Sequence, residues 1–118
     1  MARVIELYDT TLRDGTQAEN FNLSVDDKIK VCRQLDRLGI DFIEGGWPGS
    51  NPLAVDFFKR MQDVELKQAK LAAFGSTRHF QKSPEKDANI QALLAAQTPA
   101  VTIFGKSWDI HVIDALRI

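Results

Sequence analysis

The sequence has few of the features that would assign it to a specialised class of protein. Its one cysteine, Cys32, excludes an internal disulfide framework and predicts a packed, unreactive thiol in a reducing cytoplasm. The net charge is −1, with basic and acidic residues interspersed, so we expect no nucleic-acid partner. No apolar run approaches the ~18 residues that a membrane span needs. The N-terminus also lacks the apolar stretch of a signal peptide, and we expect an ordinary globular domain.

The sequence also has few histidines, and its glycines do not form a dinucleotide-binding motif. His79 and His111 are the only two histidines, and neither is spaced to form a pair of metal ligands. We therefore expect both to be surface or capping residues. The glycines at positions 45, 46 and 49 lack the spacing of a dinucleotide-binding fingerprint.

Short apolar runs alternate with amphipathic helical patterns along the whole chain. We predict strands over residues 4–9, 41–45, 70–74 and 100–104. We predict a first helix that begins after an N-cap at Ser24 and ends at Gly39. Three more helices are predicted from Asn51–Pro52 through Met61, from about Glu85 through Leu94, and from Ser107 through Leu116. Leu53, Phe57 and Phe58 are expected in the core.

This alternation predicts an α/β fold with a parallel sheet built from right-handed βαβ units. A doubly wound open sheet and a (β/α)8 barrel both satisfy it. A complete barrel needs about 250 residues, so 118 residues can hold about four β/α units, the N-terminal half of a TIM barrel. The last helical pattern stops at Ile118 without a capping residue, so we expect a truncated chain.

Polar and glycine-rich loops follow all four predicted strands, whereas the loops at the opposite end look like plain connectors. Because the carboxyl ends of parallel strands gather on one face, this pattern predicts a single functional rim. Its polar members are Asp9, Arg13, Asp14, Gln17, Glu44, Arg78 and Lys106.

Residue chemistry alone leaves several roles open on this rim. Asp14 can bind a hard divalent cation while Arg13 grips a carboxylate or carbonyl, or the two can form a local ion pair. Glu44 ends a buried strand and needs a partner, either Arg13 or a metal-bound water. For Asp9 a structural hydrogen-bonding role is favoured. Trp47 either lines a pocket or packs a rigid turn.

Four motifs carry a family resemblance that spans nearly the whole chain. Residues 9–17 (DTTLRDGTQ) resemble the signature of the metal-dependent barrel superfamily that includes 2-isopropylmalate, homocitrate and citramalate synthases, hydroxymethylglutaryl-CoA lyase and the carboxyltransferase domains of biotin enzymes. Residues 42–52, 72–78 and 101–111 are similar to the citramalate synthase branch, with 2-isopropylmalate synthases next. The resemblance identifies residues 1–118 as the N-terminal part of a catalytic TIM-barrel domain of the pyruvate carboxyltransferase type.

The resemblance implies condensation of acetyl-CoA with a 2-oxo acid, giving (R)-citramalate when that acid is pyruvate. It implies a divalent metal (Mg, Mn or Zn) held by Asp14, Arg13 as oxyanion stabiliser and Glu44 as a catalytic support. Gln17, Arg78 and Lys106 are the candidate substrate-binding residues, and a homodimer is expected.

One departure limits these expectations. The superfamily completes its metal site with a His-x-His pair, which nothing in this sequence matches. We therefore expect this 118-residue piece to be inactive alone. A different class of function, a noncatalytic half-barrel that assembles with a partner through its open edges, is the alternative.

Overall fold

The centre of the fold is a parallel sheet, seen in a computed structural model that describes residues 3–118. Strands β1 (Tyr8–Asp9), β2 (Phe42–Gly46), β3 (Lys70–Ser76) and β4 (Ala100–Phe104) lie side by side in chain order. They are connected by helices α1 (Val25–Leu38), α2 (Pro52–Met61) and α3 (Ala88–Ala95). Three short elements complete the chain: the 3-10 turns η1 (Gly15–Gln17) and η2 (Pro84–Lys86), and the π-helix η3 (His111–Leu116).

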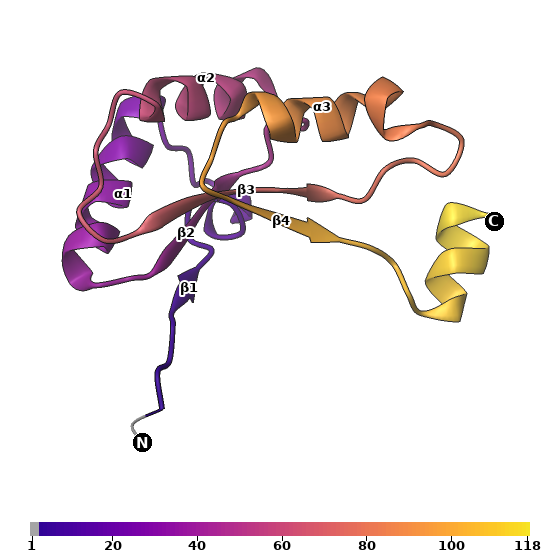
Figure 1. The fold of residues 1–118 in the computed structure, drawn as a ribbon, viewed down its shortest axis with the longest axis horizontal. Coiled ribbons are helices and arrows are strands. Elements are labelled where there is room, and N and C mark those ends of the chain that lie inside the picture. Colours follow the sequence, from indigo (N-terminus) through magenta and orange to yellow (C-terminus); the bar gives the residue numbers. More distant parts are fainter. Residues whose placement is uncertain (1–2) are drawn as a thin grey trace.

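The strand order separates the two architectures that the sequence left open. A doubly wound sheet reverses its strand order and carries helices on both faces. In a barrel, each unit adds the next strand on the same side and keeps its helix on the outside. Here the order β1-β2-β3-β4 has no reversal, and α1, α2 and α3 lie on one side of the sheet (Figure 1). The α/β class is confirmed, and the arrangement is that of half a (β/α)8 barrel.

The hydrophobic core lies between the sheet and these helices. Ile43 and Ala73 alternate along their strands with residues that face the other way, and both are fully buried. Phe57 and Phe58 of α2 pack against them as predicted, whereas Leu53 is 46% exposed, which corrects the expectation that it belongs to the core. Leu53 is the second residue of α2, whose start is exposed.

Cys32 is a buried core residue of α1, as expected. Burial raises the pKa of its thiol to about 12, so the nucleophilic thiolate is not populated at neutral pH.

The helix ends follow the signals in the sequence. Ser24 caps α1 in a reciprocal box with Asp27, and Gly39 ends the helix in the left-handed conformation with φ 98°. The Asn51 side chain accepts a hydrogen bond of 2.8 Å from the amide of Ala54 at the start of α2.

Several boundaries differ from the predictions. β2 and β3 end at Gly46 and Ser76 rather than at residues 45 and 74, and the last predicted helix, from Ser107, is instead the π-helix η3 from His111. The first strand is only Tyr8–Asp9, because β1 has one neighbouring strand and the residues before Tyr8 extend beyond it, with Val4 85% exposed. The third helix begins at Ala88 rather than near Glu85, because the Asp87 carboxylate caps it by accepting from the amide of Ile90.

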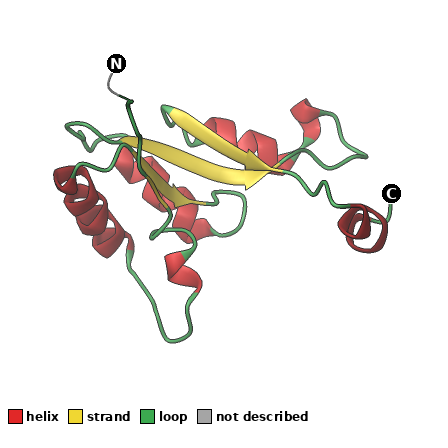
Figure 2. Ribbon diagram, turned by 90° about the horizontal axis from the view of Figure 1, so that it is seen from below, coloured by secondary structure: helices red, strands yellow, loops and turns green. Residues whose placement is uncertain are grey.

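The final segment, around η3, lies away from the three-helix layer, beyond the carboxyl end of β4 (Figures 1 and 2). No helix within residues 3–118 is long and apolar enough to cross a membrane.

Candidate functional site

The face of the sheet opposite the helices carries one side chain of the candidate site from each strand. Tyr8 of β1, Glu44 of β2, Phe74 of β3 and Thr102 of β4 share this face, since side chains alternate along a strand. Their mutual contacts, given below, place them in the concave interior of the half-barrel.

Glu44 is the buried acid of this interior, with 1% of its surface exposed. One carboxylate oxygen accepts a hydrogen bond from Nε of Arg13, and the other accepts from the Tyr8 hydroxyl. The sequence left two partners open for Glu44, Arg13 or a metal-bound water, and in the structure Glu44 pairs with Arg13. A charge-assisted pair of this kind is how a buried carboxylate is tolerated.

Arg13 is held on two sides. The loop that carries it folds over the carbonyl of Thr10, which accepts from the amides of Arg13 (3.2 Å), Asp14 (2.8 Å) and Gly15 (3.2 Å). Its guanidinium carbon lies 4.0 Å from the centroid of the Phe74 ring, and Nη1 is 3.7 Å from Asp14 Oδ1. The pairing with Glu44 uses Nε, which leaves Nη1 near Asp14.

The two aspartates of the loop differ in their availability. Asp9 accepts from the amide of Thr11 at 2.9 Å and from its hydroxyl at 3.1 Å, which is the structural role favoured from sequence. The Asp14 side chain is 64% exposed. Within residues 3–118, no group of three or more His, Cys, Asp and Glu side chains could hold a metal ion. Asp14 therefore fits one oxygen ligand of a hard cation, not a complete set.

Three aromatic rings form a wall beside Arg13. Phe74 stacks on Phe104 with centroids 5.2 Å apart, and Trp47 meets both edge-on at 5.7 and 5.8 Å. The Trp47 indole nitrogen donates to Oδ1 of Asn89 (2.7 Å), whose amide nitrogen donates to the carbonyl of Ser76 (2.6 Å). Trp47 thus does both things considered from sequence: it packs the turn and lines a hollow.

That hollow, of about 720 Å³, lies on the other side of the aromatic wall. Arg78 and Lys106 line it together with Trp47 and Phe104. Arg78 is engaged within its own loop, where Nη1 donates to the carbonyls of three loop residues, the shortest bond being 2.8 Å to Lys82.

Of the remaining predicted residues, Gln17 does not line this hollow, whereas His79 does. Gln17 ends η1 and is exposed. His79 has a local role as expected, with its Nδ1 accepting from the amide of Gln81 at 3.2 Å. The structure therefore brings Arg13, Asp14 and Glu44 into one group and Arg78 with Lys106 into another.

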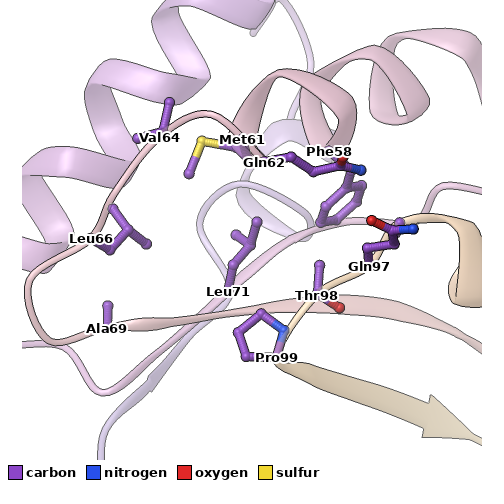
Figure 3. Close-up of a pocket in the computed structure, with 11 residues that line it drawn as sticks. Phe58, Met61, Gln62, Val64, Leu66, Ala69, Leu71, Gln97, Thr98 and Pro99 are labelled. Carbon is purple, nitrogen blue, oxygen red and sulfur yellow. The ribbon is translucent and has the colours of Figure 1, made fainter.

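A second hollow lies at the opposite end of the sheet. Its volume is about 180 Å³, and Figure 3 shows Phe58, Met61 and Leu71 lining it together with Pro99, which precedes β4. No acidic, basic or histidine side chain lines it, so it offers no group for acid–base or metal chemistry.

Comparison with known proteins assigns the chain to a family. A profile described as HMGL-like matches residues 4–118. The chain belongs to the HMGL-like family. It is 56% identical over 115 residues to an (R)-citramalate synthase of Geobacter sulfurreducens, covering 98% of this chain and 22% of that protein.

Other relatives extend the comparison. An (R)-citramalate synthase of Synechocystis is 57% identical over 111 residues, 94% of this chain and 20% of that protein. A 2-isopropylmalate synthase of Lysinibacillus sphaericus is 37% identical over 110 residues, 93% of this chain and 20% of that protein. The chain thus spans about a fifth of the length of the curated relatives it matches.

Sequence reasoning assigned no role to three polar residues of this candidate site. Tyr8 and Thr102 contact each other, Tyr8 also contacts Glu44, and Asn89 fixes Trp47. A threonine in the middle of the apolar run Ala100–Phe104 was the one available signal, because an inward-facing hydroxyl needs a partner.

Proposed function

We propose that the full-length protein containing this chain condenses acetyl-CoA with pyruvate, giving (R)-citramalate and CoA for isoleucine biosynthesis. Four (R)-citramalate synthases that are 45–57% identical over nearly all of this chain support the proposal. The observation that carries it is the Arg13 guanidinium, held by Glu44 and Phe74 with Nη1 3.7 Å from Asp14 Oδ1.

Arg13 is the proposed oxyanion stabiliser. When the deprotonated methyl group of acetyl-CoA attacks the keto carbon of pyruvate, a carbon–carbon bond forms and the keto oxygen takes up negative charge. A pre-oriented guanidinium donates N–H groups to that oxygen, and one such donor is worth about 3 kcal/mol of transition-state stabilisation. Hydrolysis of the thioester then releases CoA.

Glu44 is proposed to act through Arg13. Both of its carboxylate oxygens accept hydrogen bonds within the protein and only 1% of its surface is exposed, so substrate has little access to it. Its negative charge offsets that of the guanidinium, whose side chain is only partly exposed, and its bond to Nε fixes the rotation of the fork.

Asp14 is the proposed protein ligand of a divalent metal, Mg, Mn or Zn. When bound, such an ion polarises the carbonyl and neutralises charge on the 2-oxo acid. Because the described residues supply one fitting carboxylate, we expect the remaining ligands from the rest of the full-length protein.

The other site residues and the setting complete the proposal. Gln17, Arg78 and Lys106 are proposed to contact the 2-oxo acid or acetyl-CoA, the last two from the hollow behind the aromatic wall. Residues 1–118 would form the N-terminal part of the catalytic barrel domain of a cytoplasmic homodimer. We expect residues 1–118 alone to have no catalytic activity.

The experiment is a substrate panel on the full-length protein. With Mg²⁺ or Mn²⁺ present, acetyl-CoA is combined with pyruvate or 2-oxoisovalerate, CoA release is followed with a thiol reagent, and products are identified by mass spectrometry. Citramalate from pyruvate is expected. Product from 2-oxoisovalerate alone would assign 2-isopropylmalate synthesis instead, and no CoA release with either acid would favour the noncatalytic assembly module.

A matched pair of variants tests the metal ligand. Asp14→Asn should abolish turnover and weaken metal binding measured by calorimetry, because a neutral amide is a poorer ligand for a hard cation. Asp56→Asn is the control, since Asp56 is an exposed residue of α2. Equal metal affinity in both variants would contradict the role of Asp14.

A further inference from the structure

We infer that Tyr8 is a positioning residue for this reaction: its hydroxyl, held by Thr102, fixes the Glu44 carboxylate and through it the Arg13 guanidinium. The inference rests on the proposed function. It adds to that function two residues, from the first and fourth strands, that the DTTLRDGTQ motif does not contain.

The directions of the hydrogen bonds follow from the donor inventory. The Glu44 carboxylate, paired with Arg13, only accepts, so the single proton of the Tyr8 hydroxyl is donated to Glu44. The Tyr8 oxygen is then free to accept, and the Thr102 hydroxyl, 2.7 Å away, must be the donor. The result is an ordered chain from Thr102 through Tyr8 to Glu44, met from the other side by Arg13.

The chain requires a protonated tyrosine. Burial and the hydrogen bond to Glu44 raise the pKa of Tyr8 to about 12, so the hydroxyl remains a donor throughout the neutral and moderately alkaline range.

The geometry also depends on the curvature of the sheet. β1 and β4 are the two edges of a four-stranded sheet, and β2 and β3 lie between them. The Tyr8 and Thr102 hydroxyls nevertheless meet, which requires the sheet to curl so that its edges approach across the interior. Tyr8 thereby links both edge strands to the acid of β2.

The hydrogen bond from Tyr8 to Glu44 restrains the rotation of the Arg13 guanidinium, which the Phe74 ring does not fix. The contact at 4.0 Å holds the guanidinium over the face of the Phe74 ring but does not fix its rotation there. The bond from Nε to Glu44 fixes the rotation, provided that the carboxylate does not turn. Tyr8 holds the second carboxylate oxygen and so prevents that turn.

The test uses three variants of the full-length protein in the citramalate assay. Tyr8→Phe removes the donor, Thr102→Val removes the hydroxyl at nearly constant shape, and Thr102→Ser restores it. Thr98→Val is the matched control, because the Thr98 hydroxyl bonds only to the nearby carbonyl of Ala100, before β4 enters the site. Thermal unfolding is recorded for each variant.

A positioning role predicts a specific kinetic pattern. Tyr8→Phe should lower kcat by about 10- to 100-fold, the range seen when a supporting residue is removed behind a ligand. The KM for acetyl-CoA should stay unchanged, because the interaction matters in the transition state. Thr102→Val should lower kcat less, while Thr102→Ser and Thr98→Val should match the unchanged protein.

The outcomes separate a failure of the proposed function from a failure of the role inferred for Tyr8. If the unchanged protein makes no citramalate, the proposed function fails and the role of Tyr8 in it fails too. If the unchanged protein is active and Tyr8→Phe keeps its kcat, only the role of Tyr8 is overturned. Should Tyr8→Phe not fold, the Thr102 pair decides: equal kcat in Thr102→Val and Thr102→Ser overturns the inference.

Discussion

The guanidinium carbon of Arg13 lies 4.0 Å from the centroid of the Phe74 ring, while its Nε donates to Glu44. The ring holds the guanidinium on its face and the carboxylate holds it along one edge. A planar, delocalised cation satisfies both contacts at once, whereas an ammonium group has neither a face nor a fork. These two contacts therefore hold Nη1 at a fixed place near Asp14.

The first prediction concerns this double restraint. Arg13→Lys keeps the charge but loses the stacking and the fork, so kcat of the full-length protein should fall by about 10²- to 10³-fold. Arg60→Lys is the control, because Arg60 forms an exposed pair with Asp26 on the helical side. Steady-state kinetics with pyruvate measures both, and less than about a tenfold loss in Arg13→Lys would show that charge alone suffices.

The second prediction concerns the aromatic wall and the choice of 2-oxo acid. Phe104 stacks on Phe74, the ring beneath Arg13, so Phe104→Ala should open space next to the guanidinium. The kcat/KM ratio of 2-oxoisovalerate to pyruvate should rise by about tenfold or more, since one or two methylene groups are worth about 1–3 kcal/mol in a pocket. Phe21→Ala, in the exposed loop before α1, should leave the ratio unchanged. An unaltered ratio in Phe104→Ala would place the specificity elsewhere.

The sequence predicted the features that depend on local chemistry. The caps at Ser24, Gly39 and Asn51 are confirmed because each is fixed by the conformation of a few neighbouring residues. The gathering of Arg13 and Glu44 followed from strand polarity alone, since both lie at carboxyl ends of parallel strands.

Features that depend on the curvature of the sheet and on the position of a strand at its edge could not be predicted from the sequence. The contact between Tyr8 and Thr102 joins residues 94 positions apart and exists only because the sheet curls. β1 is short because it has a single neighbouring strand, and no pattern of residues in the sequence indicates its position at the edge of the sheet. The anchoring of Trp47 by Asn89 likewise requires knowing that α3 returns over the loop after β2.

The third prediction concerns Gly45, whose missing side chain makes room for the core. A Cβ there would lie 2.7 Å from a ring carbon of Phe57 and 3.0 Å from a methyl of Leu71, both inside the packed layer. Gly45→Ala should therefore destabilise the fold by about 1–3 kcal/mol, the usual cost of overpacking. In Gly15→Ala the new Cβ meets only Thr11 at an ordinary 3.5 Å. Urea unfolding followed by circular dichroism compares the two, and equal midpoints would mean that the Phe57 ring can move aside.

The fourth prediction concerns the pH dependence set by Asp36, at the end of the sheet away from the site. Its carboxylate accepts from the amides of Lys67 (2.8 Å), Gln68 (2.9 Å) and Ala69 (2.8 Å), tying α1 to the start of β3. Burial by itself would raise the pKa of Asp36, but these three bonds outweigh it and hold the pKa below the usual 3.8.

Because the folded pKa is the lower one, this carboxylate contributes its stability above pH 3.8 and loses it as the pH falls through the folded value. Asp36→Asn should therefore lower the free energy of unfolding at neutral pH, by about 1–3 kcal/mol for the lost charged acceptor. The difference from the unchanged protein should shrink below pH 3.8, where Asp36 first becomes protonated in the unfolded chain and then, at lower pH, in the folded protein. Asp63→Asn, at an exposed position after α2, should show no such pH-dependent difference. Denaturant titrations from about pH 7 down to about pH 3 measure all three proteins, and a constant difference across that range would exclude Asp36 as the titrating group.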